Sequence, residues 1–67
     1  MNELTGIRNT LLAEQIEEQI YEYVTQRGLS PGERLPNEFE MANMFGVGRS
    51  TVREAVKILV SRGVLET

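Results

Sequence analysis

The 67-residue chain contains no cysteine and no histidine, and its one lysine is Lys57. These absences exclude disulfide bonds, thiolate zinc sites, thiol nucleophiles and imidazole general bases. No nucleophile–base pair can be assembled from what remains, so we expect neither an enzyme nor a bound metal or other cofactor. No apolar run is long enough to cross a membrane, and the N-terminus lacks the apolar core of a signal peptide. We therefore expect a cytoplasmic protein that makes no membrane contact.

The charge of the chain is small in total but unevenly distributed. The formal net charge is −3, and the length allows one small domain. Residues 1–46 carry three basic and eight acidic side chains, a balance of −5, whereas residues 47–67 carry four basic and two acidic ones, a balance of +2. Because local charge decides which surface meets a polyanion, the C-terminal third is the candidate surface.

The stretch from Gly46 to Leu59 organises the rest of the chain. Gly46-Val47-Gly48 predicts a turn, and the following residues predict a helix over 49–62 that Gly63 ends. At 100° per residue, four apolar side chains share one arc and predict a buried stripe: Val52, Ala55, Val56 and Leu59. Polar and basic side chains occupy the remaining surface, with Arg49 in the first turn: Ser50, Arg53, Lys57 and Ser61.

The basic row Arg49, Arg53 and Lys57 allows two interpretations. Such a row is commonly a solvated helix face. Alternatively, the mutual repulsion of cations spaced four residues apart is offset by a negative partner, for which the phosphate-lined major groove of DNA is suitable. The row alone does not decide between them.

Upstream, residues 1–9 show no periodicity and predict a flexible N-terminal arm. Thr10 is the expected cap of a helix that runs to Arg27. Its expected buried side consists of apolar residues at helical spacing: Leu12, Ala13, Ile16, Ile20, Tyr23 and Val24. Its opposite side carries Glu14, Glu18 and Glu22, which we expect to face solvent away from any polyanion; a carboxylate metal site is the alternative.

A second, shorter helix is predicted over residues 38–45. Residues 30–33 read as a type II turn and 34–36 as extended. Asn37 and Glu40 form an expected capping box. The expected buried side consists of Met41, Ala42, Met44 and Phe45.

The order of short helix, tight turn and longer helix predicts a helix-turn-helix over 38–62. A phosphate-binding loop at 46–48 is the alternative, but the Lys-Ser/Thr pair that such a loop needs is missing. After Gly63, residues 64–67 alternate apolar and polar and predict the start of a strand.

Three segments resemble the GntR family of bacterial transcription regulators: Pro31-Gly32-Glu33-Arg34-Leu35-Pro36-Asn37-Glu38, Gly46-Val47-Gly48-Arg49-Ser50-Thr51-Val52-Arg53-Glu54-Ala55 and Arg62-Gly63-Val64-Leu65-Glu66. The likeness covers residues 12–67. It implies a mainly α, three-helix helix-turn-helix of winged-helix type over 10–67, with the wing truncated after residue 67. It also implies a C-terminal effector-binding and dimerisation domain that this chain lacks.

The resemblance implies roles for individual residues. Arg49 and Arg53 occupy the positions that the family uses to read base edges, and Ser50 and Thr51 those that contact phosphate. We add Lys57 and the two helix starts, at Asn37 and Gly48, as phosphate contacts. The implied partners are a palindromic double-stranded DNA operator, a second copy of the protein bound through the absent domain, and a small-molecule effector of that domain. The segment Arg53-Glu54-Ala55-Val56 weakly resembles the corresponding segment of the branch of the family that responds to fatty acids and organic acids.

Two positions depart from the family pattern. Gly48 stands where a serine or threonine is usual, and Phe39 stands where many members carry a DNA-contacting arginine. A second function stays open independently of these departures: a helical protein-interaction module on the winged-helix scaffold, with the surface of the first helix as the contact and Tyr21 and Tyr23 as candidate residues. Ionic strength separates the two, since DNA binding weakens steeply with salt.

Overall fold

The computed structural model describes residues 3–28 and 35–65, with side chains described from Ile7 onward. Within these ranges the chain forms three helices and no strand: α1 (Glu3–Arg27), α2 (Glu38–Phe45) and α3 (Arg49–Ser61). The expected mainly α architecture is confirmed. The turn predicted over 30–33, and Arg34 after it, lie outside the described residues.

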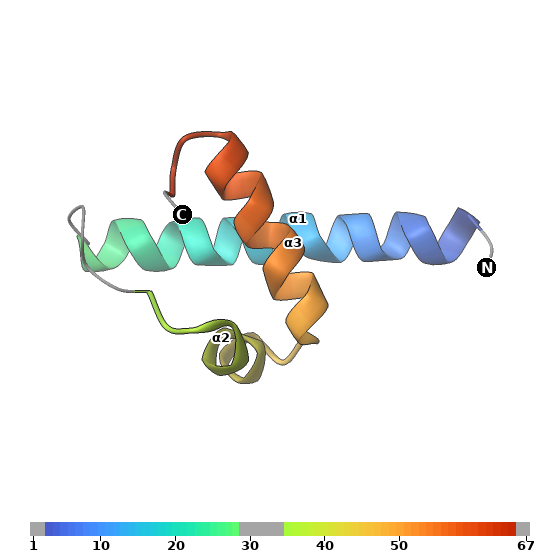
Figure 1. Cartoon of the computed structure of the whole chain (residues 1–67), viewed down its shortest axis with the longest axis horizontal. Coiled ribbons are helices and arrows are strands. Elements are labelled where there is room, and N and C mark those ends of the chain that lie inside the picture. The colour runs from blue at the N-terminus through green and yellow to red at the C-terminus, as the bar shows by residue number, and fades with distance from the viewer. Residues whose placement is uncertain (1–2, 29–34, 66–67) are drawn as a thin grey trace.

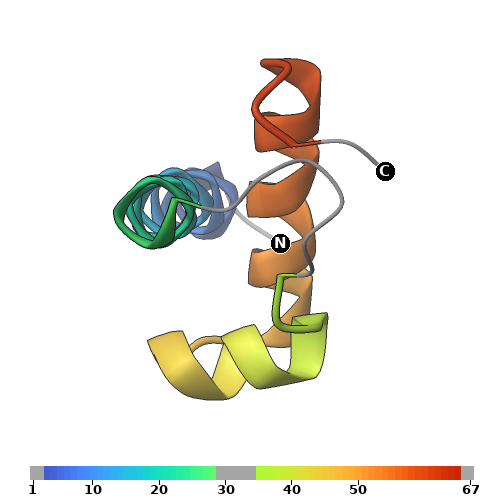
Figure 2. The same cartoon turned by 90° about the vertical axis from the view of Figure 1, so that its left-hand side faces the viewer.

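Helix α3 is the centre of the arrangement, because it packs against both of the other helices. It crosses α1 near the middle of that helix, and α2 lies beside its N-terminal end (Figure 1). In the turned view, α1 is seen nearly end-on at one side of α3, and α2 lies below, at the N-terminal end of α3 (Figure 2). The 25 residues of α1, about 37 Å of helix, account for most of the longest dimension, 41 Å.

The core forms where the three helices meet. Its buried members come from every helix: Ile16, Ile20, Met41, Ala42, Val52, Ala55 and Leu59. Half-buried side chains from the helix ends and connections surround them: Val24, Leu35, Phe45, Val47, Val56, Val64 and Leu65. The apolar residues spaced four apart on α1 and the stripe on α3 thus meet as predicted, which leaves the opposite face of α3 in solvent.

Helix α1 begins at Glu3 rather than at Thr10, so the predicted start of this helix is wrong. Residues 3–9 contain one glycine and no proline. Once a helix is nucleated, adding a residue at its end costs far less than starting a new helix, so a segment without its own periodicity can extend one. Ile7 and Leu11 are exposed on this extension.

Helix α2 has the predicted bounds and caps. The Asn37 side chain accepts a hydrogen bond from the Glu40 backbone N–H at 2.8 Å, and the Asn37 N–H donates to the Glu40 carboxylate at 3.1 Å. Gly46 ends the helix in the left-handed region, with φ of 69°. Met44 is 50% exposed, so its predicted burial is wrong. It lies on the side of α2 away from the buried Met41 and Ala42.

Helix α3 begins after Gly48 and ends at Ser61, one residue before its predicted end. Gly63, with φ of 77°, closes it in a Schellman arrangement, in which the Val64 N–H donates to the Leu59 carbonyl. Val64 and Leu65 then pack on the core and form a bend, not a strand, while the last two residues of the predicted strand lie outside the described residues. Arg62 pairs with the buried carboxylate of Glu17, which joins this end of α3 to α1.

Candidate nucleic-acid interface

The face of α3 opposite the core carries the predicted interface residues. Arg49, Ser50, Arg53 and Lys57 are exposed and Thr51 is half-buried. These five residues are called the basic face below. Because Val52, Ala55 and Leu59 fix the rotation of α3 against the core, the basic face has one orientation relative to the rest of the fold.

The two helix starts that the sequence predicts as phosphate contacts, at Asn37 and Gly48, lie at the same end of this face. Gly48 is the N-cap of α3, with φ of −74° and ψ of 157°, and its backbone provides the cap without a side-chain hydrogen bond. Asn37 caps α2 and precedes Glu38, whose side chain contacts α3 directly. The structure therefore brings the starts of α2 and α3 to one end of the basic face.

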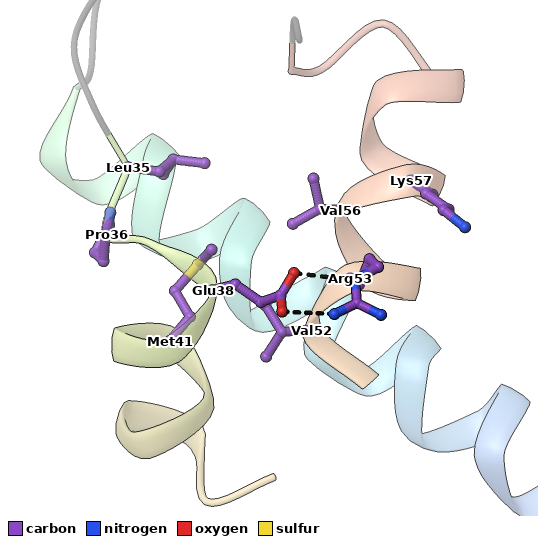
Figure 3. Close-up of a pocket in the computed structure, with 8 residues that line it drawn as sticks. All are labelled: Leu35, Pro36, Glu38, Met41, Val52, Arg53, Val56 and Lys57. Carbon is purple, nitrogen blue, oxygen red and sulfur yellow. Dashed lines mark hydrogen bonds and ion pairs between the residues drawn. The ribbon is translucent and has the colours of Figure 1, made fainter. Parts of the chain in front are cut away.

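Glu38 links the two arginines, a contact that sequence reasoning missed. Arg53 donates to its carboxylate twice, from Nε to Oε2 at 3.1 Å and from Nη2 to Oε1 at 2.8 Å (Figure 3). Arg49 donates once, from Nε to Oε1 at 3.3 Å. In the sequence Glu38 has the features of an ordinary first-turn acidic residue, and only the angle between α2 and α3 brings it to the arginines.

This arrangement shifts two ionisation equilibria. The hydrogen bonds from Arg53 hold the pKa of the Glu38 carboxyl below its ordinary value of 4.5, and the charge of Arg53 and the contact from Arg49 act in the same direction. The hydrogen bond to Glu38 in turn raises the pKa of Arg53. Both groups are therefore charged at neutral pH.

An apolar hollow of about 300 Å³ lies between α2 and α3 beside this pair (Figure 3). Its walls are mainly apolar and its rim is charged: Leu35, Pro36, Glu38, Met41, Val52, Arg53, Val56 and Lys57. Lys57 is exposed at this rim and contacts Glu54 of the same helix, with Nζ 3.4 Å from Oε1. Exposed ion pairs of this kind are weak, so Lys57 is available to a stronger anion.

The acidic row on α1 has the predicted orientation. Glu14, Glu18 and Glu22 are all exposed. The described side chains contain no group of three or more carboxylates arranged to hold a metal ion. Nor does any helix within the described ranges combine the length and the apolar character needed to cross a bilayer.

Comparison with known proteins identifies the helix-turn-helix. Residues 12–67 match the family described as bacterial regulatory proteins, gntR family. The chain belongs to the GntR family. It is 38% identical over 55 residues to proteins named HTH-type transcriptional repressor NanR, from Edwardsiella tarda (strain FL6-60) and from Escherichia coli O1:K1 / APEC. This match covers 82% of the chain and 21% of each repressor, and no solved structure matches the chain.

Membership in the GntR family gives the chain a function at DNA. The chain is a DNA-binding part of a transcription regulator. It spans about a fifth of the length of the curated repressors that it matches.

Proposed function

We propose that α3 is the recognition helix and enters the major groove of an operator with its basic face toward the bases. One observation carries this proposal: the core fixes α3 so that its cations and hydroxyls point outward together. Arg49 and Arg53 would donate pairs of hydrogen bonds to O6 and N7 of guanines. Neither arginine is needed for the core.

The surrounding groups would hold the domain on the phosphates. Ser50, Thr51 and Lys57 flank the two arginines along α3. The backbone N–H groups at the starts of α2 and α3, beside Asn37 and Gly48, offer further donors at the positive ends of helix dipoles. The acidic row of α1 lies on the far side of that helix from the core, where it would face solvent.

The proposal extends to the assembly. A palindromic operator would be bound by two copies in the cytoplasm, held together by a C-terminal domain that also binds a small-molecule effector. Repressors named NanR, of which the chain covers 21%, are long enough to hold such a domain.

Affinity measurements at several salt concentrations test the recognition role. A duplex selected from a random pool by the wild-type protein would be compared with a scrambled duplex. We expect log affinity to fall with log salt by about 0.9 for each phosphate neutralised, and Lys57→Ala to reduce that slope by about 1 on both duplexes. Arg27→Ala, on α1, removes an equal charge and should leave the slope unchanged. Salt-independent affinity would favour the protein-interaction alternative.

Exposed apolar residues on α1 are the observation that favours this alternative. Ile7, Leu11 and Tyr21 are exposed, and Arg62 lies over the Tyr21 ring at 5.8 Å. Tyr23 is half-buried, and the Arg27 guanidinium lies 4.4 Å from the centre of its ring. Leu11→Ser would lower the affinity for a protein partner but would not alter the dependence of DNA affinity on salt concentration.

A further inference from the structure

The geometry around Glu38 points to a specificity-determining role for this carboxylate. We infer that Glu38 holds the guanidinium groups of Arg49 and Arg53 with their base-reading edges outward, and that it suppresses their attraction to phosphate at random sites. This inference rests on the proposed function, since it concerns how the same two arginines choose between cognate and random DNA.

The first argument comes from which nitrogens Glu38 occupies. Arg53 uses Nε and one hydrogen of Nη2, the side edge of the guanidinium group. A guanidinium group has five N–H donors, so the end edge, formed by Nη1 and the second hydrogen of Nη2, remains complete. That edge carries two parallel donors, which match O6 and N7 of guanine. In Figure 3 the remaining nitrogen of Arg53 points away from Glu38.

Arg49 follows the same pattern with a single contact. It donates from Nε to Glu38 Oε1, which leaves both of its terminal nitrogens available. The side chains of Arg49 and Arg53 remain 62% and 54% exposed while bound in this way. Glu38 therefore restricts the two long side chains without covering the atoms that would contact a base.

The second argument concerns charge. Two arginines and one glutamate give the cluster a net charge of +1, where the arginines alone would give +2. Phosphate contacts supply most of the affinity for random DNA, and they scale with the cations available. Recognition of a guanine, in contrast, depends on whether the two parallel N–H donors of an arginine point at its O6 and N7 acceptors. A carboxylate on the side edge therefore reduces binding to random sequences more than binding to the cognate site.

The third argument is the environment of the carboxylate. Its side chain is 31% exposed and lines the hollow between α2 and α3, which Met41 and Val56 also line. The two-point contact with Arg53 is directional, so it favours one orientation of the guanidinium group even where water has access. The capping box of α2 further restricts Glu38, because the helix begins at this residue.

The decisive variant is Glu38→Gln, which keeps the shape of the side chain and removes its charge. We expect its affinity for a scrambled duplex to rise, its affinity for the selected duplex to stay level or fall, and the ratio of the two to drop about tenfold. Glu18→Gln is the matched control, because it removes an equal charge from the exposed row of α1. The control should leave the ratio unchanged.

The outcomes separate the inference from the function on which it depends. If the wild-type protein does not distinguish the selected from the scrambled duplex, the proposed function fails. If the wild-type protein distinguishes them and Glu38→Gln keeps the same ratio, the role of Glu38 is overturned. An equal rise on both duplexes also overturns it, since that result reflects long-range charge alone.

A measurement on the wild-type protein covers the case in which the variant does not fold. The ¹⁵N heteronuclear NOE of Nε reports how restricted each arginine side chain is on the picosecond-to-nanosecond scale. We expect a higher value for Arg53 than for Arg8, which is exposed on α1. Equal values would show that Glu38 does not hold Arg53 in solution and would overturn the inference.

Discussion

Arg53 donates two hydrogen bonds to Glu38 and Arg49 donates one, yet neither side chain belongs to the core. Replacing either with alanine should cost about 1–3 kcal/mol of operator binding, because each would lose a pair of hydrogen bonds to a base. The melting temperature should hardly change, since ion pairs this exposed contribute little to stability. Fluorescence anisotropy on the selected duplex and thermal melts would measure the two effects. Unchanged affinity in both variants would remove these arginines from the recognition role.

The ionisation of Glu38 gives a second prediction at this scale. Its folded-state pKa is lowered below the ordinary value of 4.5, chiefly by the hydrogen bonds from Arg53. A depressed carboxyl pKa contributes stability that is present above the unfolded pKa and is lost as the pH falls through the folded pKa. We expect the Glu38 carboxyl carbon to titrate below pH 4.5 by NMR. In Arg53→Ala its midpoint should rise; an unmoved midpoint would contradict the assigned cause.

At the scale of the element, the two glycines of the turn have different roles. Gly46 has φ of 69°, and a Cβ added there would meet nothing within 4 Å. Gly46→Ala should therefore lower the free energy of unfolding by about 1–2 kcal/mol, through the left-handed backbone conformation alone. Gly48 has φ of −74°, which any residue adopts, and an added Cβ would lie 3.9 Å from Ser50 Oγ. Gly48→Ser should therefore stabilise the protein by a few tenths of a kcal/mol. Denaturant unfolding of both variants would show opposite signs; equal destabilisation would contradict this reading of the turn.

The apolar stripe of α3 is graded rather than uniform. Leu59 is fully buried, whereas Val56 is half-buried beside the hollow between α2 and α3. Leu59→Ala should cost about 2–5 kcal/mol, a large part of the stability of so small a domain. Val56→Ala should cost clearly less, because Val56 loses less buried area. Circular dichroism melts would rank them, and the reverse order would mean that α3 is rotated from its described position.

Local chemistry explains which elements were predictable. The capping box at Asn37 and the glycines at Gly46 and Gly63 determine helix ends through neighbouring residues, so the bounds of α2 were predicted correctly and those of α3 to within one residue. The start of α1 was not, because an extension of an existing helix needs no signal of its own. The contact of Glu38 with the arginines was also missed. It depends on how α2 is angled against α3, which no local pattern contains.

At the scale of the whole molecule, the fold separates the two signs of charge. The acidic row of α1, Glu14, Glu18 and Glu22, lies on its exposed side, while α3 presents the basic face on the side away from the core. The net charge of −3 therefore opposes a polyanion at long range while the local surface attracts it. We therefore expect low affinity for DNA in general, with specific binding carried by base contacts and by a second copy of the protein.

The last prediction concerns the 67-residue chain by itself, which should bind operator DNA weakly. One recognition helix engages one half-site, so we expect micromolar or weaker affinity at physiological salt, with a smaller preference for the selected duplex over a scrambled one than two joined copies would show. Joining two copies by a flexible linker would raise the effective concentration at the second half-site and tighten binding to a palindrome by a factor of about 10² or more.

The linked protein should gain nothing on a duplex that carries a single half-site, which serves as the control. Anisotropy titrations of both proteins against both duplexes measure the difference. Nanomolar, site-specific binding by the unlinked chain would contradict the prediction and would show that the chain pairs by itself. In that case the exposed apolar residues Ile7 and Leu11 of α1 would be the first candidates for the contact, because they lie outside the core.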